Sequence, residues 1–176
     1  DCSDHEVNLK ILLDLAVRAG ELSHEDRDQL LRDVTDDVVA HVLEDSFLQA
    51  QILAQEVQES PARVFAYEDL MNQLEEEKLV NRAVEKLPAS DVMAERRRAG
   101  DGMWRPELAV LLADAKRSLT DALIEGSLVD DAFFETDLRE YFPDKVLERC
   151  GHLLPEHPLR RELVATIVSN DVLNAM

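Results

Sequence analysis

The sequence contains little glycine and proline and no signal of a β-hairpin, which favours helices over sheets. It holds five Gly and six Pro in 176 residues, and it has no alternating run of β-branched residues. Its one Asp-Gly pair, Asp101-Gly102, follows an arginine-rich stretch rather than an apolar segment. Sheets and hairpins are typically marked by alternating β-branched residues and by Asn-Gly or Asp-Gly turns between apolar segments, so an all-α fold is predicted. Because no internal repeat recurs at a fixed period, we expect an irregular multi-helix array with no sheet.

Long apolar runs and spaced cysteines are also missing. No stretch of about 18 apolar residues occurs, so no segment is predicted to span a membrane. Cys2 and Cys150 are the only cysteines, and they lie far apart without metal-ligand spacing. Free thiols in a reducing compartment are the simplest explanation, and we therefore expect a cytoplasmic protein.

Positive charge is scarce relative to negative charge. There are 38 acidic residues and 19 Lys and Arg residues, which gives a formal net charge of −19. A negative charge of this size repels both a nucleic-acid backbone and an anionic membrane surface, so neither is expected as a partner. The apolar fraction of 45% is nevertheless that of a folded domain rather than of a disordered acidic tail.

The sequence does contain a succession of helical patterns with ordinary start and stop signals. Ser23, Asn81 and the pairs Ser60-Pro61 and Arg105-Pro106 mark starts, whereas Gly20 and Gly100 mark ends. We expect helices at 4–19, 23–32, 35–58, 61–77, 81–87, 90–99, 105–125 and 131–142, with a last helix after Pro158.

An arginine-rich stretch interrupts this succession. Residues 96–102 hold three Arg and two Gly, and they are predicted to form a mobile loop. The charged residues that follow among leucines are Arg105, Glu107 and Lys116. Helix capping, a surface ion pair and packing account for these three residues without a functional site.

The first helical pattern is apolar around most of its circumference. Leu9, Leu12 and Leu13 lie on one stripe, and neighbouring apolar residues widen it. Ser3 followed by Glu6 fits a capping box at the start of this helix. Because there is no Met at position 1 and no lead-in, we expect a fragment of a longer polypeptide whose upstream part covers some of this helix.

Polar groups crowd the opening turn, and they allow three interpretations. Asp1, Asp4, His5 and Glu6 are metal-ligand types, but no spaced partner set follows, so no metal site is expected. Ser3 and His5 are two apart, and side chains at that spacing on a helix point away from each other, which disfavours a nucleophile and base. A capped helix start with solvated acids remains.

Three blocks of residues carry a resemblance to a known family. They are DCSDHEVN at 1–8 with KILL at 10–13, RPELAVLLA at 105–113 with AK at 115–116, and LRRE at 159–162 with AT at 165–166 and NDV at 170–172. In this order they resemble the C-terminal region of the large NAD-specific bacterial glutamate dehydrogenases. Leu9 and Asp114 stand where other residues are common in that family.

The resemblance implies an activity and one substrate contact. The parent protein would oxidatively deaminate L-glutamate to 2-oxoglutarate and ammonium while reducing NAD. In this family a serine after the nucleotide-binding domain holds the side-chain carboxylate of glutamate, together with a lysine from elsewhere, and its place matches Ser3. A hydroxyl at a helix N-terminus suits an anion. The resemblance assigns no individual role to Asp1, Asp4, His5 or Glu6.

The resemblance also implies a domain organisation. Residues 1–20 would form a helix continuing from an upstream catalytic domain, and 21–176 a helical C-terminal domain. The catalytic Lys and Asp and the NAD site would lie upstream, and no Gly-x-Gly-x-x-Gly turn occurs in this sequence. We therefore expect no catalytic, cofactor-binding or metal-binding residue in this chain. The fragment on its own is expected to be inactive. The expected partners are the upstream domain and further copies in a homo-oligomer. The alternative is an acidic helical protein-interaction domain without catalysis.

Overall fold

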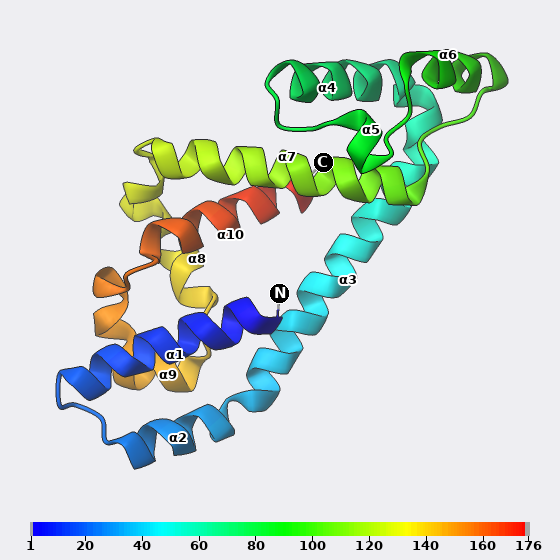
Figure 1. Cartoon of the computed structure of the whole chain (residues 1–176). Helices are drawn as coiled ribbons and strands as arrows, with labels where there is room; N and C mark the ends of the chain where they lie inside the picture. The colour runs from blue at the N-terminus through cyan, green and yellow to red at the C-terminus, as the bar shows by residue number, and fades with distance from the viewer. Residues whose placement is uncertain (1, 175–176) are drawn as a thin grey trace. The chain divides into compact units, whose positions relative to one another are not determined.

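The computed structural model describes residues 2–174, and it describes side chains for residues 4–173. Helices and short 3-10 turns make up all the regular structure of this part of the chain, without a strand (Figure 1). The prediction of an all-α fold without a sheet is therefore confirmed for the described residues. None of their helices is both long and apolar enough to cross a membrane.

The elements follow one another with short connections. In chain order they are α1 (Cys2–Arg18), α2 (His24–Asp33), α3 (Thr35–Glu59), η1 (Ser60–Arg63), α4 (Val64–Glu76), α5 (Arg82–Glu85), α6 (Ser90–Ala99), α7 (Arg105–Glu125), η2 (Leu128–Asp130), η3 (Ala132–Phe134), α8 (Glu135–Glu140), α9 (Asp144–Cys150), η4 (Gly151–Glu156) and α10 (Arg160–Asn174).

Several helix ends lie where the sequence predicts them. The Ser23 hydroxyl accepts from the backbone N–H of Asp26 at the start of α2, and the Asn81 side chain caps α5. Gly100 ends α6 with a φ of 76°, a left-handed conformation that glycine adopts without strain. These local signals are reliable because a cap depends only on residues within one turn.

Two expected helices differ from the structure. The helix expected at 131–142 is broken into η3 and α8, because the Asp131 carboxylate accepts from the N–H of Phe133 and starts a separate short turn. The helix expected from Pro61 begins with the 3-10 turn η1 before α4. In both places a proline or aspartate favours a tight turn over a continuous helix.

The chain divides into two compact units. Unit 1 comprises residues up to 47 together with 120–171, and unit 2 comprises 48–119 together with the residues from 172 onward. The boundary expected after residue 20, between a helix that continues from an upstream catalytic domain and a helical C-terminal domain, stays a prediction. Within the chain, α1 belongs to the same unit as α2.

The core of unit 1 is built on α1. Leu12 and Leu13 are completely buried, and α1 packs against α2, α9 and η4. Other members of this core are Leu9, Ala16, Val34, Val129, Leu138, Phe142, Val146, Cys150, Val164 and Ala165. We expected part of the cover of α1 to lie upstream. Residues of this chain bury the main stripe of α1, and Val7 is the large apolar residue of α1 that stays exposed within the described residues. The upstream part of that cover stays a prediction.

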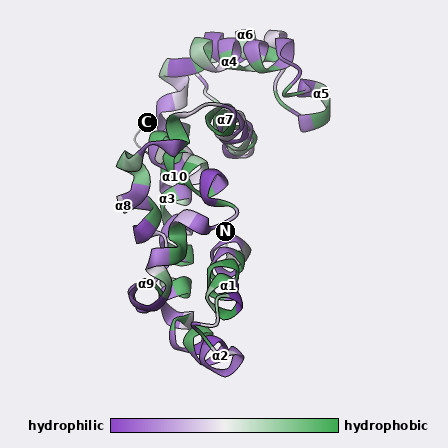
Figure 2. Ribbon diagram, turned by 90° about the vertical axis from the view of Figure 1, so that its left-hand side faces the viewer, coloured by the Kyte–Doolittle hydropathy of each residue, from purple (hydrophilic) through white to green (hydrophobic). Residues whose placement is uncertain are grey.

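Unit 2 has a separate core between α4, α6 and α7. Met71 and Met93 are completely buried there, and Leu74, Leu108 and Leu111 pack with them. Figure 2 shows that the helices of the chain carry both apolar and polar residues along their length, as amphipathic helices do. Each unit therefore has an apolar core of its own.

Candidate functional site

The first turn of α1 holds the one residue that the resemblance assigns to the substrate. The helix begins at Cys2, earlier than expected, so the backbone of Ser3 lies within the first turn rather than at the N-cap position. The capping box predicted for Ser3 is therefore wrong in register. The side chain of Ser3 and the whole of Asp1 lie outside the described residues, and the substrate role of Ser3 stays a prediction.

A buried asparagine fixes the second turn of α1. Asn8 is 8% exposed, and its Nδ2 donates to the backbone carbonyl of Asp4 at 2.9 Å and to the hydroxyl of Tyr141 at 3.3 Å. The Oδ1 atom of Asn8 is buried without a hydrogen-bond partner within the described residues. An unpaired buried oxygen destabilises a fold, whereas the two hydrogen bonds of Nδ2 hold the side chain in place.

His5 packs on the same tyrosine. Its ring stacks on that of Tyr141 with centroids 4.3 Å apart and planes 15° from parallel, and Nε2 donates to Oδ2 of Asp45 at 3.2 Å. The ring of His41, one turn before Asp45 on α3, lies 5.7 Å away. The pKa of Tyr141 is raised to about 12, chiefly by burial and to a smaller extent by the charges of Asp4 and Asp45, whereas the hydrogen bond from Asn8 lowers it. This hydroxyl therefore stays protonated near neutral pH.

The described acids of the opening turn, Asp4 and Glu6, are not part of a cluster of metal-ligand side chains. Glu6 forms an exposed ion pair with Lys10 at 2.5 Å, one turn further along α1. No group of three or more His, Cys, Asp or Glu side chains within the described part of the chain has the arrangement of metal ligands. Among the described residues of this turn, Glu6 thus pairs at the surface of the helix, whereas His5 is turned onto unit 1.

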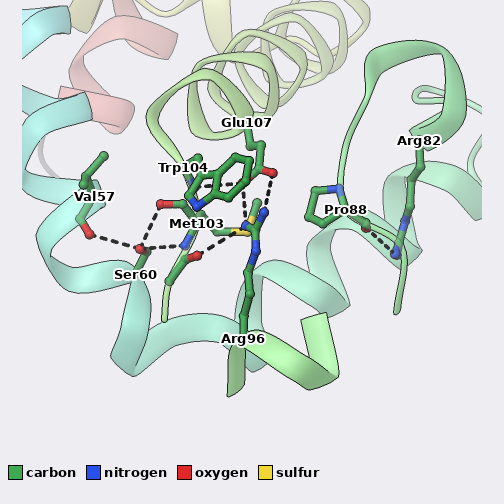
Figure 3. A network of polar contacts seen from close by, with 9 residues as sticks. Val57, Ser60, Arg82, Pro88, Arg96, Met103, Trp104 and Glu107 are labelled. Atoms are coloured by element: carbon green, nitrogen blue, oxygen red, sulfur yellow. Dashed lines mark hydrogen bonds and ion pairs between the residues drawn. The ribbon is translucent and has the colours of Figure 1, made fainter. Parts of the chain in front are cut away.

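Unit 2 contains a buried ion pair that the sequence patterns do not reveal (Figure 3). Nη1 and Nη2 of Arg96 donate to the two carboxylate oxygens of Glu107 at 2.6 and 2.8 Å, and both side chains are at most 10% exposed. The hydrogen bond to Glu107 raises the pKa of Arg96. Glu107 also accepts from the N–H of Trp104 at 2.7 Å, so it caps α7. Glu107 thus caps a helix, as the sequence predicts, but its ion pair is buried and not on the surface.

A buried hydroxyl lies beside this ion pair. Ser60 donates to the backbone carbonyl of Val57 at 3.0 Å and accepts from the backbone N–H of Met103 at 2.9 Å. Figure 3 shows these bonds converging on one side chain between η1 and the segment that leads into α7. Together with Arg96 and Glu107, the hydroxyl fixes residues 100–104, so this network is structural.

Unit 2 also contains a hollow of 190 Å³. Its walls are apolar side chains of α3, α4 and α7, and at its rim the Tyr67 hydroxyl and Arg63 both donate to Glu56. Burial, followed by the hydrogen bond to Glu56, raises the pKa of Tyr67. The rim groups pair with one another, so the hollow offers an apolar surface rather than groups for chemistry.

Two protein families match opposite ends of the chain. Residues 1–56 match the family described as "Bacterial NAD-glutamate dehydrogenase, catalytic domain". Residues 100–176 match the family described as "Glutamate dehydrogenase, C-terminal". The first match includes the turn that carries Ser3, His5 and Asn8, and the second includes Glu107, Tyr141 and the whole of α10.

Individual relatives match over the whole chain. An NAD-specific glutamate dehydrogenase of Pseudomonas aeruginosa is 39% identical over 176 residues, which is 100% of this chain and 11% of the relative. One of Halomonas elongata has the same identity and coverage. One of Mycobacterium tuberculosis is 37% identical over 174 residues, 99% of this chain and again 11% of the relative. The chain thus spans about one ninth of the length of these relatives.

Proposed function

We propose, from the membership of this chain in the bacterial NAD-glutamate dehydrogenase family, that it is part of an enzyme that converts L-glutamate to 2-oxoglutarate and ammonium while reducing NAD. The observation that supports this proposal is the similarity to three glutamate dehydrogenases over the entire chain. The proposed location of the enzyme is the cytoplasm.

Within this enzyme, Ser3 would contact the side-chain carboxylate of glutamate. Its backbone lies in the first turn of α1, a helix of 17 residues. The unpaired backbone amides and the positive end of the dipole favour an anion at such a turn. The body of α1 is buried in unit 1, so the helical region downstream serves as the support that holds this turn in place.

NAD would be held by another part of the parent enzyme. A dinucleotide pyrophosphate is bound at a glycine-rich turn between a strand and a helix, and the described residues contain no strand. This supports placing the cofactor in another part of the parent enzyme, and we derive no step of hydride transfer from the described residues. The catalytic Lys and Asp that the family resemblance implies would also lie outside this chain, which on its own would be inactive.

Substitution of Ser3 tests the substrate contact. In the full-length enzyme, Ser3→Ala should lower kcat/KM for glutamate by about 10- to 150-fold, because a hydrogen bond to a charged group contributes about 1.5–3 kcal/mol. The KM for NAD should not change. Ser46→Ala, which removes an exposed hydroxyl from α3, is the matched control. Unchanged glutamate kinetics in Ser3→Ala would exclude the substrate contact but not the family.

The exposed face of α3 supports a further proposal about assembly. Val39, Leu43 and Phe47 recur every four residues, and Leu43 and Phe47 are 64% and 67% exposed. An apolar stripe of this kind is typical of a surface that another protein segment covers. We propose that the upstream part of the parent enzyme covers it, because this chain spans only 11% of the length of its relatives. A change in the mass of the Phe47→Asp enzyme would indicate a second copy in a homo-oligomer instead. If Phe47→Asp left both the mass and the thermal stability of the full-length enzyme unchanged, this proposal would be wrong.

A further inference from the structure

In the described part of the first two turns of α1, polar side chains face unit 1. Among residues 4–8, Asp4, Glu6 and Val7 are exposed, whereas His5 and Asn8 are turned onto the unit. The apolar core of the helix starts only at residue 9. Terminal turns of helices fray readily because their first amides lack intrahelical partners. The contacts of His5 and Asn8 therefore help to fix the orientation of this turn.

The contacts of His5 join three elements that are distant in sequence. Its Nε2 reaches Asp45 of α3 at 3.2 Å, and its ring lies flat on that of Tyr141, the residue that follows α8. The His5 side chain is 10% exposed. A flat stack and a directed hydrogen bond restrict both the tilt and the rotation of the ring, which an apolar side chain in the same place would not do.

Asn8 reinforces the same arrangement one turn later. It bonds the carbonyl of Asp4 in the turn itself and the hydroxyl of the tyrosine on which His5 stacks. The backbone carbonyl of Asn8 accepts from Nε2 of the buried His157 at 3.1 Å. Tyr141 is thus contacted from both turns, and the start of α1 is fixed relative to α3 and to the end of α8.

We propose that His5 is a positioning residue, which holds the first turn of α1, and Ser3 within it, in the orientation that binds the side-chain carboxylate of glutamate. This inference rests on the substrate contact proposed above for Ser3. A binding group must be held within a fraction of an ångström to be effective, and residues that touch no substrate commonly supply that constraint. Asp45 and Tyr141 act through His5 in the same way.

The test is the substitution of His5 in the full-length enzyme. We expect His5→Ala to raise the KM for glutamate about tenfold, with kcat within about twofold of the unsubstituted enzyme and the KM for NAD unchanged. His152→Ala is the matched control, because it also removes a histidine–carboxylate contact in unit 1, the 2.9 Å contact with Glu21, but at an exposed site beyond the other end of α1. It should leave all three constants unchanged.

Variants of the partners separate positioning from general packing. Tyr141→Phe keeps the stack and should leave the KM for glutamate within about twofold, whereas Tyr141→Leu should raise it as His5→Ala does. Asp45→Asn should raise it in the same direction. Combined with His5→Ala, Asp45→Asn should add little, because both substitutions remove one shared contact.

Each outcome decides between the two proposals. If Ser3→Ala raises the KM for glutamate and His5→Ala does not, positioning by His5 is wrong while the substrate contact stands. If Ser3→Ala has no effect on the KM for glutamate, the substrate contact is wrong, and the positioning role of His5, which rests on it, is wrong as well. A His5→Ala enzyme that loses kcat and NAD binding in step with thermal stability would show a merely structural residue. If that variant does not fold, the comparison of Tyr141→Phe with Tyr141→Leu distinguishes positioning from a structural role.

Discussion

His157 and Asn8 are 149 residues apart, and Nε2 of the buried imidazole donates to the backbone carbonyl of the asparagine at 3.1 Å. The other ring nitrogen, Nδ1, accepts from the backbone N–H of Leu159 at 3.2 Å. One nitrogen therefore carries a hydrogen and the other does not, which is the neutral form of histidine. Burial lowers the pKa of His157, although the hydrogen bond to Asn8 and the charge of Glu162 oppose the shift.

This histidine should make the stability of unit 1 depend on pH. The pKa of His157 lies below its ordinary value of about 6.5, so the unfolded chain takes up a proton at a higher pH than the folded chain. The stabilising effect is complete above about pH 6.5 and is lost as the pH falls through the folded-state pKa. Urea unfolding at pH 7.5 and 5.5 should show a smaller loss in His157→Gln than in the unsubstituted chain. His24→Gln, at an exposed site on α2, should retain the full loss.

The buried ion pair of unit 2 should be sensitive to the loss of either charge. Glu107→Gln leaves Arg96 buried without its counter-charge, and it should lower the free energy of unfolding by about 3–5 kcal/mol. Glu59→Gln breaks the half-exposed pair with Arg63 and should cost less than about 1 kcal/mol. Urea unfolding followed by the fluorescence of Trp104, the sole tryptophan, reports on this unit. Equal effects of the two substitutions would contradict the role of burial.

Gly102 should not tolerate a side chain. A Cβ atom there would overlap the Ser60 hydroxyl and lie 2.7 Å from Cδ of Pro61. Gly102→Ala should therefore displace the segment before α7 and lower the free energy of unfolding by about 1–3 kcal/mol. Gly126→Ala is the control, because its Cβ would lie 3.4 Å from the nearest atom, the carbonyl oxygen of Ala122. Thermal unfolding of both variants checks the difference, which should vanish if Ser60 and Pro61 can move aside.

Cys150 should react slowly in the folded protein. Its side chain is in the core of unit 1, and burial raises the pKa of the thiol, so little thiolate is present or accessible. In a Cys2→Ser variant, a disulfide reagent at pH 8 should modify Cys150 at least about 100-fold more slowly without urea than with it. Rapid modification of the native protein would mean that α9 opens readily.

The helices were predictable from sequence because their signals are local. Ser23, Asn81 and Gly100 each act within one turn, and each does so in the structure. Of the mobile loop predicted at 96–102, residues 100–102 do lie between two helices, but residues 96–99 belong to α6. This difference has the opposite cause. Arg96 belongs to α6, and its partner Glu107 is in the next helix, so neither the pairing nor its burial can be read from the arginine-rich stretch.

The candidate site was predictable only in part. The opening turn was identified as the place of interest, but its individual roles were not, because the partners of His5 and Asn8 lie far along the chain. Asp45 is 40 residues away, and Tyr141 and His157 are 133 and 149 residues from Asn8. Only folding brings these groups to the start of α1.

The Ser60 hydroxyl ties together two points of the chain that are 43 residues apart. The polypeptide between them, which contains α4, α5 and α6, leaves this point and returns to it. Most of it coincides with residues 57–99, the interval outside both family matches. A segment closed at its base can change in length without moving its ends. The exposed turn at Lys78 is therefore a suitable place to insert an epitope tag or a fluorescent reporter.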